Sequence, residues 1–340
     1  LAQGGYDLAA VQGTQSNGTE VFENGDSSFS SLSIGPRSTD SMQLWTAPSG
    51  TDSDALLDSV TQDTTIAQDD WVVHQVSASG IEGLVAAEGN FSAALGNGLN
   101  VTVEQTEAST LQNRGPKSLN VTEAVANDDI ALIADAENES YYIALNTETA
   151  VFERPNSDEN LGVNADEEYT ATFTVDDSKL VGEDTEDHES VNATFEVVER
   201  SVSIDEEPVS VAAAENQTIS GSSTLAPGTE FTVTVQSTGD TSPRFYNNPT
   251  ATVQDDGTWS ISVDFDEQSS GDTFTVSSGD YFDADGEVVE AVSEPGTEAP
   301  SEDTDTPSED TDTPSESTDT PSEETATATP SESGGDDGTA

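Results

Sequence analysis

The residues with the clearest chemical potential form a short acidic motif near the end of the chain. The motif Asp283-Ala-Asp-Gly-Glu287 contains the Asp-x-Asp-Gly core of calcium loops, where closely spaced carboxylates supply oxygen ligands. A full EF-hand loop needs further oxygen ligands and a twelfth-position Glu, which are missing around Asp283, Asp285 and Glu287. We therefore expect a β-turn that uses Asp and Gly for tight geometry, with weak calcium binding as the alternative.

The two histidines, His74 and His188, match no catalytic or metal-binding pattern. His74 lies in an apolar segment and His188 in an acidic run, and neither has a second histidine at metal-ligand spacing or a Gly-x-Ser-x-Gly motif nearby. Phosphate-binding and dinucleotide-binding glycine motifs are also missing. Paired carboxylates hydrolyse glycosides in many enzymes, but the sequence singles out no pair among 69 acidic residues. The sequence predicts a protein that is not an enzyme.

Sequons of the form Asn-x-Ser/Thr recur along the chain and make N-glycosylation the most frequent candidate modification. Two of them, at Asn100 and Asn192, stand at polar positions of alternating segments, where a glycan would project away from a core. The complete set of candidates is Asn17, Asn90, Asn100, Asn120, Asn138, Asn192 and Asn216.

The charge of the chain indicates the solvent in which it works. With 69 Asp plus Glu against seven Lys plus Arg, the formal net charge is −62. Such a surface repels itself in dilute buffer, whereas molar salt reduces the Debye length to about 3 Å. The basic residues are scattered singly, so nucleic-acid binding is excluded. The carboxylates could bind Ca²⁺ or Mg²⁺ weakly, and no cysteine is present for disulfides or thiolate metal sites.

Alternating apolar and polar residues predict that nearly all regular elements are β-strands. Turn signals rich in Gly, Pro and Asp separate the candidates. Strands are expected at residues 71–76, 99–103, 130–133, 141–145, 169–175, 191–198, 231–235, 259–265 and 274–276. Short helices are expected at residues 53–60, capped by Ser53, and at residues 81–87. The expected fold is all-β, with two immunoglobulin-like β-sandwich domains.

The expected domain order is a β-rich domain at residues 1–200, a sandwich at residues 201–295 and a disordered stalk at residues 296–340. The stalk prediction rests on seven-residue units that begin with Pro and contain Ser, Thr and carboxylates but no apolar residue. The start of the chain lacks Met and the features of a signal peptide, so we expect a processed N-terminus. A membrane or lipid anchor would lie outside this chain.

Several segments resemble known surface domains of haloarchaea. The residues 221–230, 256–265, 271–276 and 283–289 are similar to the BGTF surface domain, and residues 38–48 and 75–83 to the domain that often precedes it in surface-layer-like glycoproteins. The resemblance implies an extracellular location at the cell surface, in the cell wall or S-layer, and no catalytic residues. The sorting motif and membrane segment that usually follow the stalk in that family are missing from these residues.

Three functional hypotheses follow. The first is a structural glycoprotein or spacer of the cell envelope, which associates with itself or with other surface proteins. The second is a filament in which the segment 1–21 donates a strand to the open sheet of a neighbour. The third is an adhesin or glycan-binding module, in which Tyr246 and Tyr281 contact sugars.

Overall fold

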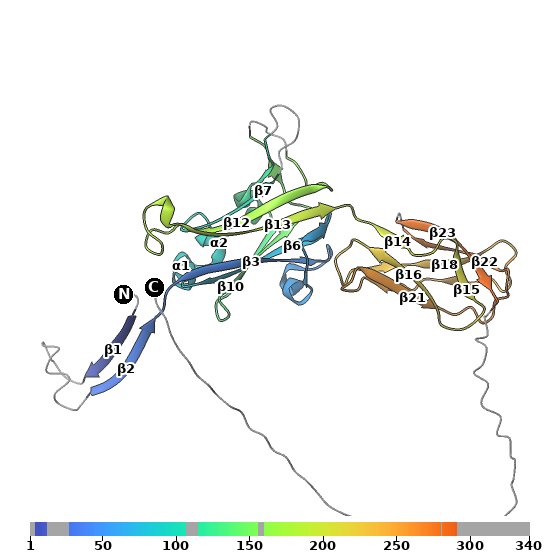
Figure 1. The fold of residues 1–340 in the computed structure, drawn as a ribbon, viewed down its shortest axis with the longest axis horizontal. Helices are drawn as coiled ribbons and strands as arrows, with labels where there is room; N and C mark the ends of the chain where they lie inside the picture. Colours follow the sequence, from blue (N-terminus) through green and yellow to red (C-terminus); the bar gives the residue numbers. More distant parts are fainter. Residues whose placement is uncertain (1–3, 12–26, 107–114, 156–159, 280, 291–340) are drawn as a thin grey trace, which may run out of the picture. The chain divides into compact units, whose positions relative to one another are not determined.

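The computed structural model describes residues 4–11, 27–106, 115–155, 160–279 and 281–290 (Figure 1). Nearly every regular element in these residues is a β-strand, and the predicted all-β architecture is confirmed. The α-helices are short and are α1 (Glu82–Glu88), α2 (Phe91–Ala94) and α3 (Val121–Ala126). None of the helices in these ranges has the length and apolar character needed to cross a membrane.

Residues 38–198 form a first sandwich of two sheets. Their strand orders are β4-β3-β6-β10-β9 and β11-β8-β7-β12-β13-β5. The first sheet contains β3 (Ser38–Ala47), β4 (Thr61–Gln62), β6 (Trp71–Ser79), β9 (Ile130–Asp135) and β10 (Ser140–Asn146). The second contains β5 (Thr65–Ala67), β7 (Leu99–Gln105), β8 (Ser118–Leu119), β11 (Phe152–Glu153), β12 (Glu167–Val175) and β13 (Glu189–Val198). Neighbouring strands are antiparallel except for β13 and β5.

The period-two pattern of the second sheet explains how the first core forms. In β12, the residues Tyr169, Phe173 and Val175 are buried, while the threonines between them face outward. The ring of Tyr169 stacks on Phe195 of β13 with centroids 5.5 Å apart. Burying one side chain of this size contributes roughly 1.5–3 kcal/mol, so alternation alone drives this face against the opposite sheet.

Strand β6 departs from strict alternation because both of its faces are covered. The 3-10 helix η1 (Ser53–Asp58) places Leu56 against Trp71 and Val73 on the outer face of the first sheet. On the inner face, Val72 and Val76 belong to the main core. The predicted helix at residues 53–60 is therefore a 3-10 helix, and Ser53 does not cap it, since the flanking position is Asp52 and makes no side-chain cap.

Residues 202–289 form a second sandwich. One sheet has the order β14-β16-β21 and the other β15-β23-β22-β18-β19, with β17 and β20 as a separate pair. This order corresponds to the A-B-E and G-F-C sheets of an immunoglobulin-type sandwich. The bounds are β14 (Val202–Ile204), β15 (Val209–Ala212), β16 (Gln217–Ser223), β17 (Glu230–Thr232), β18 (Thr234–Thr238), β19 (Tyr246–Asn247), β20 (Thr250–Thr252), β21 (Thr258–Val263), β22 (Thr273–Ser278) and β23 (Phe282–Val289).

The single strand predicted at residues 231–235 is two strands in the structure. The chain leaves the pair of β17 with β20 at the fully buried Val233 and joins β18 in the five-stranded sheet. Uninterrupted alternation therefore concealed a change of sheet, because both strands point their apolar residues toward the same core.

Two glycines make room for the large aromatic side chains of the second core. A Cβ at Gly221 would collide with the Ser203 carbonyl and lie 2.7 Å from the indole of Trp259, and one at Gly286 would collide with the ring of Phe274. Both aromatic residues are almost fully buried. These glycines thus serve close packing rather than a turn.

A third region is the hairpin of β1 (Gly4–Val11) and β2 (Ser27–Ile34), which forms a two-stranded sheet by itself (Figure 1). Residues 1–292 form one compact unit. The buried residues of the first core come from before residue 198, and those of the second core come from after it. The one exception among their buried residues is Ala67, which belongs to the second core. The boundary predicted at residue 200 lies between β13 and β14, and the predicted stalk lies outside the described residues.

Candidate glycan-bearing face and buried polar sites

The outer face of β7, β12 and β13 brings two predicted glycosylation sites together. Asn100 lies opposite Thr174 of β12, and Asn192 lies opposite Thr172, two residues earlier on that strand. Strand spacing places the two asparagines about 12 Å apart on the same exposed face. Two glycans attached there would both project into solvent without displacing a core residue.

Hydroxyl groups cover the same face. The Thr170 hydroxyl lies 3.2 Å from that of Thr106 and 3.1 Å from that of Thr194. Thr194 is the third residue of the Asn192 sequon and, being two positions along the strand, shares its face. The centre of this face is therefore polar, and Glu104, which lies opposite Thr170, places a carboxylate beside it.

The other sequons are in different settings. The side chains of Asn90 and Asn120 cap helices by accepting from the N–H of Ala93 at 2.7 Å and of Glu123 at 3.2 Å. Nδ2 of Asn138, the atom to which a glycan would attach, donates to Asp135 at 2.7 Å. Asn216 is exposed in a left-handed turn conformation, with φ 54°, and Asn17 lies outside the described residues.

The acidic motif at residues 283–287 is part of a strand and not a turn or a calcium loop. In β23 the side chains of Asp283, Asp285 and Glu287 are all exposed on one face. Along an extended strand, alternate residues lie roughly 7 Å apart, which is too far for three carboxylates to surround one ion without rearrangement. The described residues contain no group of three acidic or histidine side chains placed to hold a metal.

His74 is buried in the first core. Its Nδ1 lies 3.0 Å from the Ile143 carbonyl and must therefore carry the proton, and its ring meets Phe195 edge to face at 5.7 Å. Among the described residues Nε2 has no hydrogen-bond partner. Burial lowers the pKa of His74 to about 4, so the imidazole is neutral at pH 7. The other histidine, His188, is half-buried just after the 3-10 helix η2 (Thr185–Asp187).

Asp70 forms a polar junction that sequence reasoning missed. Its fully buried carboxylate accepts from Arg200 Nη1 at 2.8 Å, from the N–H of Ala226 at 2.7 Å and from the N–H of Ser49 at 3.2 Å. Burial raises the pKa of Asp70 above its usual range, although the hydrogen bond from Ala226 and the charge of Arg200 oppose this. Because Ala226 belongs to the second sandwich, the carboxylate binds groups from both sandwiches. A lone arginine at the predicted domain boundary was the available signal.

Lys117 forms a second buried polar site that the sequence did not reveal. Its ammonium donates to Glu167 Oε2 at 2.6 Å and to the Gly162 carbonyl at 2.8 Å, and the Tyr169 hydroxyl donates to the same Oε2 at 2.6 Å. Burial by itself would raise the pKa of Glu167, but the hydrogen bonds from Lys117, Tyr169 and the N–H of Asn164 outweigh it and lower the pKa. The site is a satisfied ion pair that joins β8 to β12.

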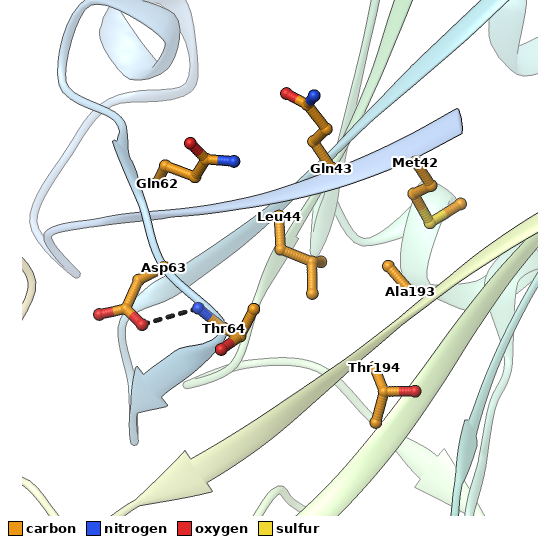
Figure 2. Close-up of a pocket in the computed structure, with 8 residues that line it drawn as sticks. All are labelled: Met42, Gln43, Leu44, Gln62, Asp63, Thr64, Ala193 and Thr194. Carbon is orange, nitrogen blue, oxygen red and sulfur yellow. Dashed lines mark hydrogen bonds between the residues drawn. The ribbon is translucent and has the colours of Figure 1, made fainter. Parts of the chain in front are cut away.

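A hollow of about 610 Å³ lies between β3 and β13, and few of its lining side chains could take part in chemistry (Figure 2). Its one carboxylate, Asp63, already accepts from the N–H of Thr64 at 2.7 Å and of Thr65 at 2.9 Å. The remaining lining side chains are neutral, from Met42, Gln43, Leu44, Gln62, Thr64, Ala193 and Thr194. Nothing in this hollow forms a catalytic arrangement.

A second cavity, of about 640 Å³, lies beside the Asp70 junction. It is lined in part by Arg200, Phe231 and Tyr281. Tyr281 is 38% exposed, and Tyr246, the other aromatic residue considered for sugar contact, is 61% exposed but does not line this cavity. Of the two predicted tyrosines, Tyr281 therefore lies beside a concave surface.

Comparison with known proteins gives sequence relatives of one kind. The chain is 37% identical over 311 residues to a "Cell surface glycoprotein" of Haloferax gibbonsii, covering 86% of this chain and 34% of the relative. It is 31% identical over 322 residues to "Cell surface glycoprotein 2" of Haloarcula hispanica, covering 84% of this chain and 34% of the relative. "Cell surface glycoprotein 1" of the same organism is 28% identical over 332 residues.

The remaining comparisons do not extend this sequence similarity. No protein-family model matches the chain, so the finer resemblance to the BGTF domain stays a prediction. A three-domain tandem of titin is 13% identical, covers 67% of this chain and 62% of that one, and superposes with a TM-score of 0.22, which is too low to carry an argument. The chain spans about a third of the length of the curated relatives it matches. Over that third it is similar in sequence to haloarchaeal cell surface glycoproteins.

Proposed function

We propose that this chain is part of a non-enzymatic structural glycoprotein in the cell envelope of a halophilic archaeon, in a surface-layer-like coat. Three relatives named as cell surface glycoproteins match about 85% of its length, which supports a place outside the cell. The proposal concerns the part of the protein that these residues form.

The observation that carries the proposal is how the structure uses its charges. Three of the seven basic residues form internal ion pairs: Arg37 with Glu189, Lys117 with Glu167, and Arg200 with Asp70. Acidic residues such as Asp283, Asp285 and Glu287 of β23 occupy exposed strand positions over an ordinary apolar core. The described surface is therefore strongly anionic, which suits a protein that stays hydrated in brine and does not bind nucleic acid.

The mechanism of such a protein is mechanical. The two sandwiches provide rigid units built on apolar cores, while the carboxylates outside them repel one another unless salt screens them. The buried Asp70 junction is screened far less and holds groups of both sandwiches at any ionic strength.

Unfolding at different salt concentrations tests the halophilic part of the proposal. The denaturant midpoint of the chain is expected to rise steadily between 0.1 and 3 M KCl, because screening removes carboxylate repulsion from the folded state. An equal midpoint at both concentrations would contradict it. Immunogold labelling of intact cells tests the location, and label confined to the cell interior would overturn the proposed function.

Within this function we assign glycans to Asn100 and Asn192, the two sequons whose amides are exposed on the outer face of β7, β12 and β13. Glycopeptide mass spectrometry of protein from the native host should find both modified. The Asn100→Gln and Asn192→Gln variants should each lose one glycan mass while keeping the far-UV circular dichroism spectrum. Asn120 provides the internal comparison, because its half-buried amide donates to Glu153 at 3.0 Å.

One observation favours a second candidate function, the binding of a glycan. The cavity beside Asp70 combines an exposed aromatic ring at Tyr281 with the guanidinium of Arg200, a combination that suits stacking and hydrogen bonding to an acidic sugar. Tyr281→Ala should then abolish binding on a glycan array, and Tyr246→Ala should not. The filament hypothesis has less support, because Gly4–Val11 of the suggested donor segment already pairs with Ser27–Ile34.

A further inference from the structure

Strands β3 and β13 each leave one edge unpaired beside the hollow of Figure 2. Among the described residues, residues 38–44 of β3 pair only with β6, because β4 pairs with Trp45 and Thr46. Residues 189–195 of β13 pair only with β12, because β5 begins its pairing at Glu196. Free strand edges present unpaired N–H and C=O groups, which proteins commonly cover. We call the hollow between these two edges the edge hollow.

Two contacts bound the edge hollow along β13. At one end, Arg37 forms an ion pair with Glu189, the first residue of the strand. At the other end, the N–H of Glu196 donates to the Thr64 carbonyl at 2.9 Å. Asn192 lies between Glu189 and Glu196 on the same strand. A glycan on Asn192 therefore starts near the middle of the opening.

The sequon of Asn192 itself contributes to the lining of the edge hollow. Its second and third residues, Ala193 and Thr194, both line the hollow. Asn192 and Thr194 share the outer face of the strand, where alternate residues are roughly 7 Å apart. The first sugar on Asn192 thus has only to turn over the edge of β13 to enter the hollow. Asn100 is two strands away on β7, with β12 between them.

The lining of the edge hollow suits a neutral saccharide. Met42, Leu44 and Ala193 provide an apolar part against which the C–H groups of a sugar ring can pack, and Thr64 provides a hydroxyl (Figure 2). Asp63 accepts the N–H groups of the next two residues through Oδ1, so its Oδ2 can accept a sugar hydroxyl. An apolar wall with a few polar groups that fix orientation is typical of ligand pockets, which measure roughly 300–1,000 Å³.

The charge of the edge hollow selects against acidic sugars. The one charged side chain in the lining is the carboxylate of Asp63, and Glu196 stands at one end of the opening. A uronic acid or a sulfated sugar would meet like charge there, whereas a neutral sugar would not.

Attachment to Asn192 makes modest contacts sufficient. A ligand tethered beside its site by a short link has an effective concentration in the millimolar range. Contacts too weak to capture a free sugar can therefore hold an attached one in the edge hollow.

We propose that the edge hollow seats the first sugars of the glycan on Asn192, and that these sugars are neutral. This rests on the proposed function, which assigns a glycan to Asn192. The seated sugars cover the free edges of β3 and β13. The glycan is then a structural part of the first sandwich as well as a source of hydration.

Amide hydrogen exchange of protein from the native host, in 3 M KCl, tests the seating. In residues 189–195, the amides that do not bond to β12 should exchange at least ten times faster in Asn192→Gln than in wild type, because removing the glycan uncovers the edge. Asn100→Gln removes a glycan from the same face and should leave these rates unchanged. Equal rates in wild type and Asn192→Gln would overturn the proposal.

Filling the edge hollow distinguishes a seated glycan from one that merely shields the strand from outside. Ala193→Leu keeps the Asn-x-Thr sequon and puts a larger side chain into the hollow. In this background, adding Asn192→Gln should change the edge exchange less than twofold, against tenfold or more with Ala193. A glycan effect of equal size in both backgrounds would contradict the proposal.

A second variant covers the case in which Ala193→Leu does not fold. Thr64→Val removes one lining hydroxyl at an exposed position and should reduce the effect of the Asn192 glycan on exchange at least threefold. An undiminished effect would count against a sugar bound in the hollow.

Glycopeptide mass spectrometry keeps this proposal distinct from the proposed function. If Asn192 carries no glycan, the glycan assignment fails and the seating fails with it. If Asn192 is glycosylated and the edge exchange is independent of the glycan, only the seating fails. A uronic acid or a sulfated sugar in the first position would overturn the neutral class.

Discussion

The two sandwiches differ in the polar groups that they bury. Among the described residues, the first sandwich buries ionisable side chains, namely Asp70, His74, Lys117 and Asp129. The buried polar residues of the second sandwich are all neutral: Ser237, Thr241, Gln268 and Ser278. The first sandwich therefore depends on the hydrogen bonds of its buried ionisable groups and on pH, whereas the second depends on the shapes of its apolar side chains.

This difference matters in brine. Salt weakens interactions between exposed charges but acts much less on buried pairs such as Lys117 with Glu167. The first sandwich thus keeps its specific polar contacts at molar salt. Four experiments test the contrast between the sandwiches, beginning with the one that should have the largest effect.

Replacing Lys117 by Met should produce the greatest loss. Glu167 would keep a buried charge without its cation, and the Gly162 carbonyl would lose its donor. Removing one partner of a buried pair destabilises by about 3–5 kcal/mol. Urea unfolding in 3 M KCl should show this loss for Lys117→Met. Lys179→Met, at an exposed position, is the control and should stay within about 0.5 kcal/mol of the wild type. A loss below 1 kcal/mol for Lys117→Met would refute the buried-pair interpretation.

His74 should make the first sandwich sensitive to acid. Its pKa is lowered from 6.5 to about 4 in the folded protein, so below pH 6.5 the unfolded chain binds the proton more readily. Stability should fall as the pH decreases from 6.5 to 4, by at most about 1.4 kcal/mol per pH unit, and this contribution should level off below pH 4. Comparing wild type with His74→Leu in 3 M KCl isolates the effect. The same pH slope in both proteins would show that His74 is not its cause.

In the second sandwich, Gly286→Ala should destabilise by about 1–3 kcal/mol through overpacking, because the new Cβ would collide with the ring of Phe274. Gly83→Ala is the matched control: it lies within α1 with no atom within 4 Å of the added Cβ, and it should stabilise by up to about 1 kcal/mol. Thermal unfolding of both variants at pH 5 and pH 7 would check that the Gly286 effect does not depend on pH.

The smallest effect is expected at Asp285. Since the carboxylates of β23 alternate along an extended strand, Asp285→Asn should change stability by less than about 0.5 kcal/mol. Calcium at millimolar concentration should shift the melting temperature of wild type and variant equally. A calcium-induced increase that the variant lacks would restore the metal-site hypothesis for this motif.

Alternation predicted the strands wherever one face is buried and the other is wet, as at residues 169–175 and 191–198. Alternation was less informative where neighbouring elements cover both faces of a strand, or where the chain changes sheets. Strand β6 is covered on both faces, the segment 231–235 changes sheets at Val233, and Gly286 accommodates a ring instead of making a turn. In each case the local sequence does not say which element or side chain packs against the segment.

The candidate glycan-bearing face was likewise predictable only in part from the sequence. The sequons and the surface charge can be read from local residues, and the period-two pattern already placed Asn100 and Asn192 at exposed positions. That they share one face about 12 Å apart follows only from the pairing of both strands with β12.

The sequence by itself determined an all-β body with a strongly acidic surface. Side-chain alternation is a local pattern, and net charge is a sum over residues, so neither depends on tertiary contacts. Tertiary structure decided which polar groups are buried together. Lys117 and Glu167 are 50 residues apart, and Asp70 and Ala226 are 156 residues apart. Such partners meet only when strands pair and sheets pack, since burial makes an isolated charge costly and selects the one arrangement in which it is bonded.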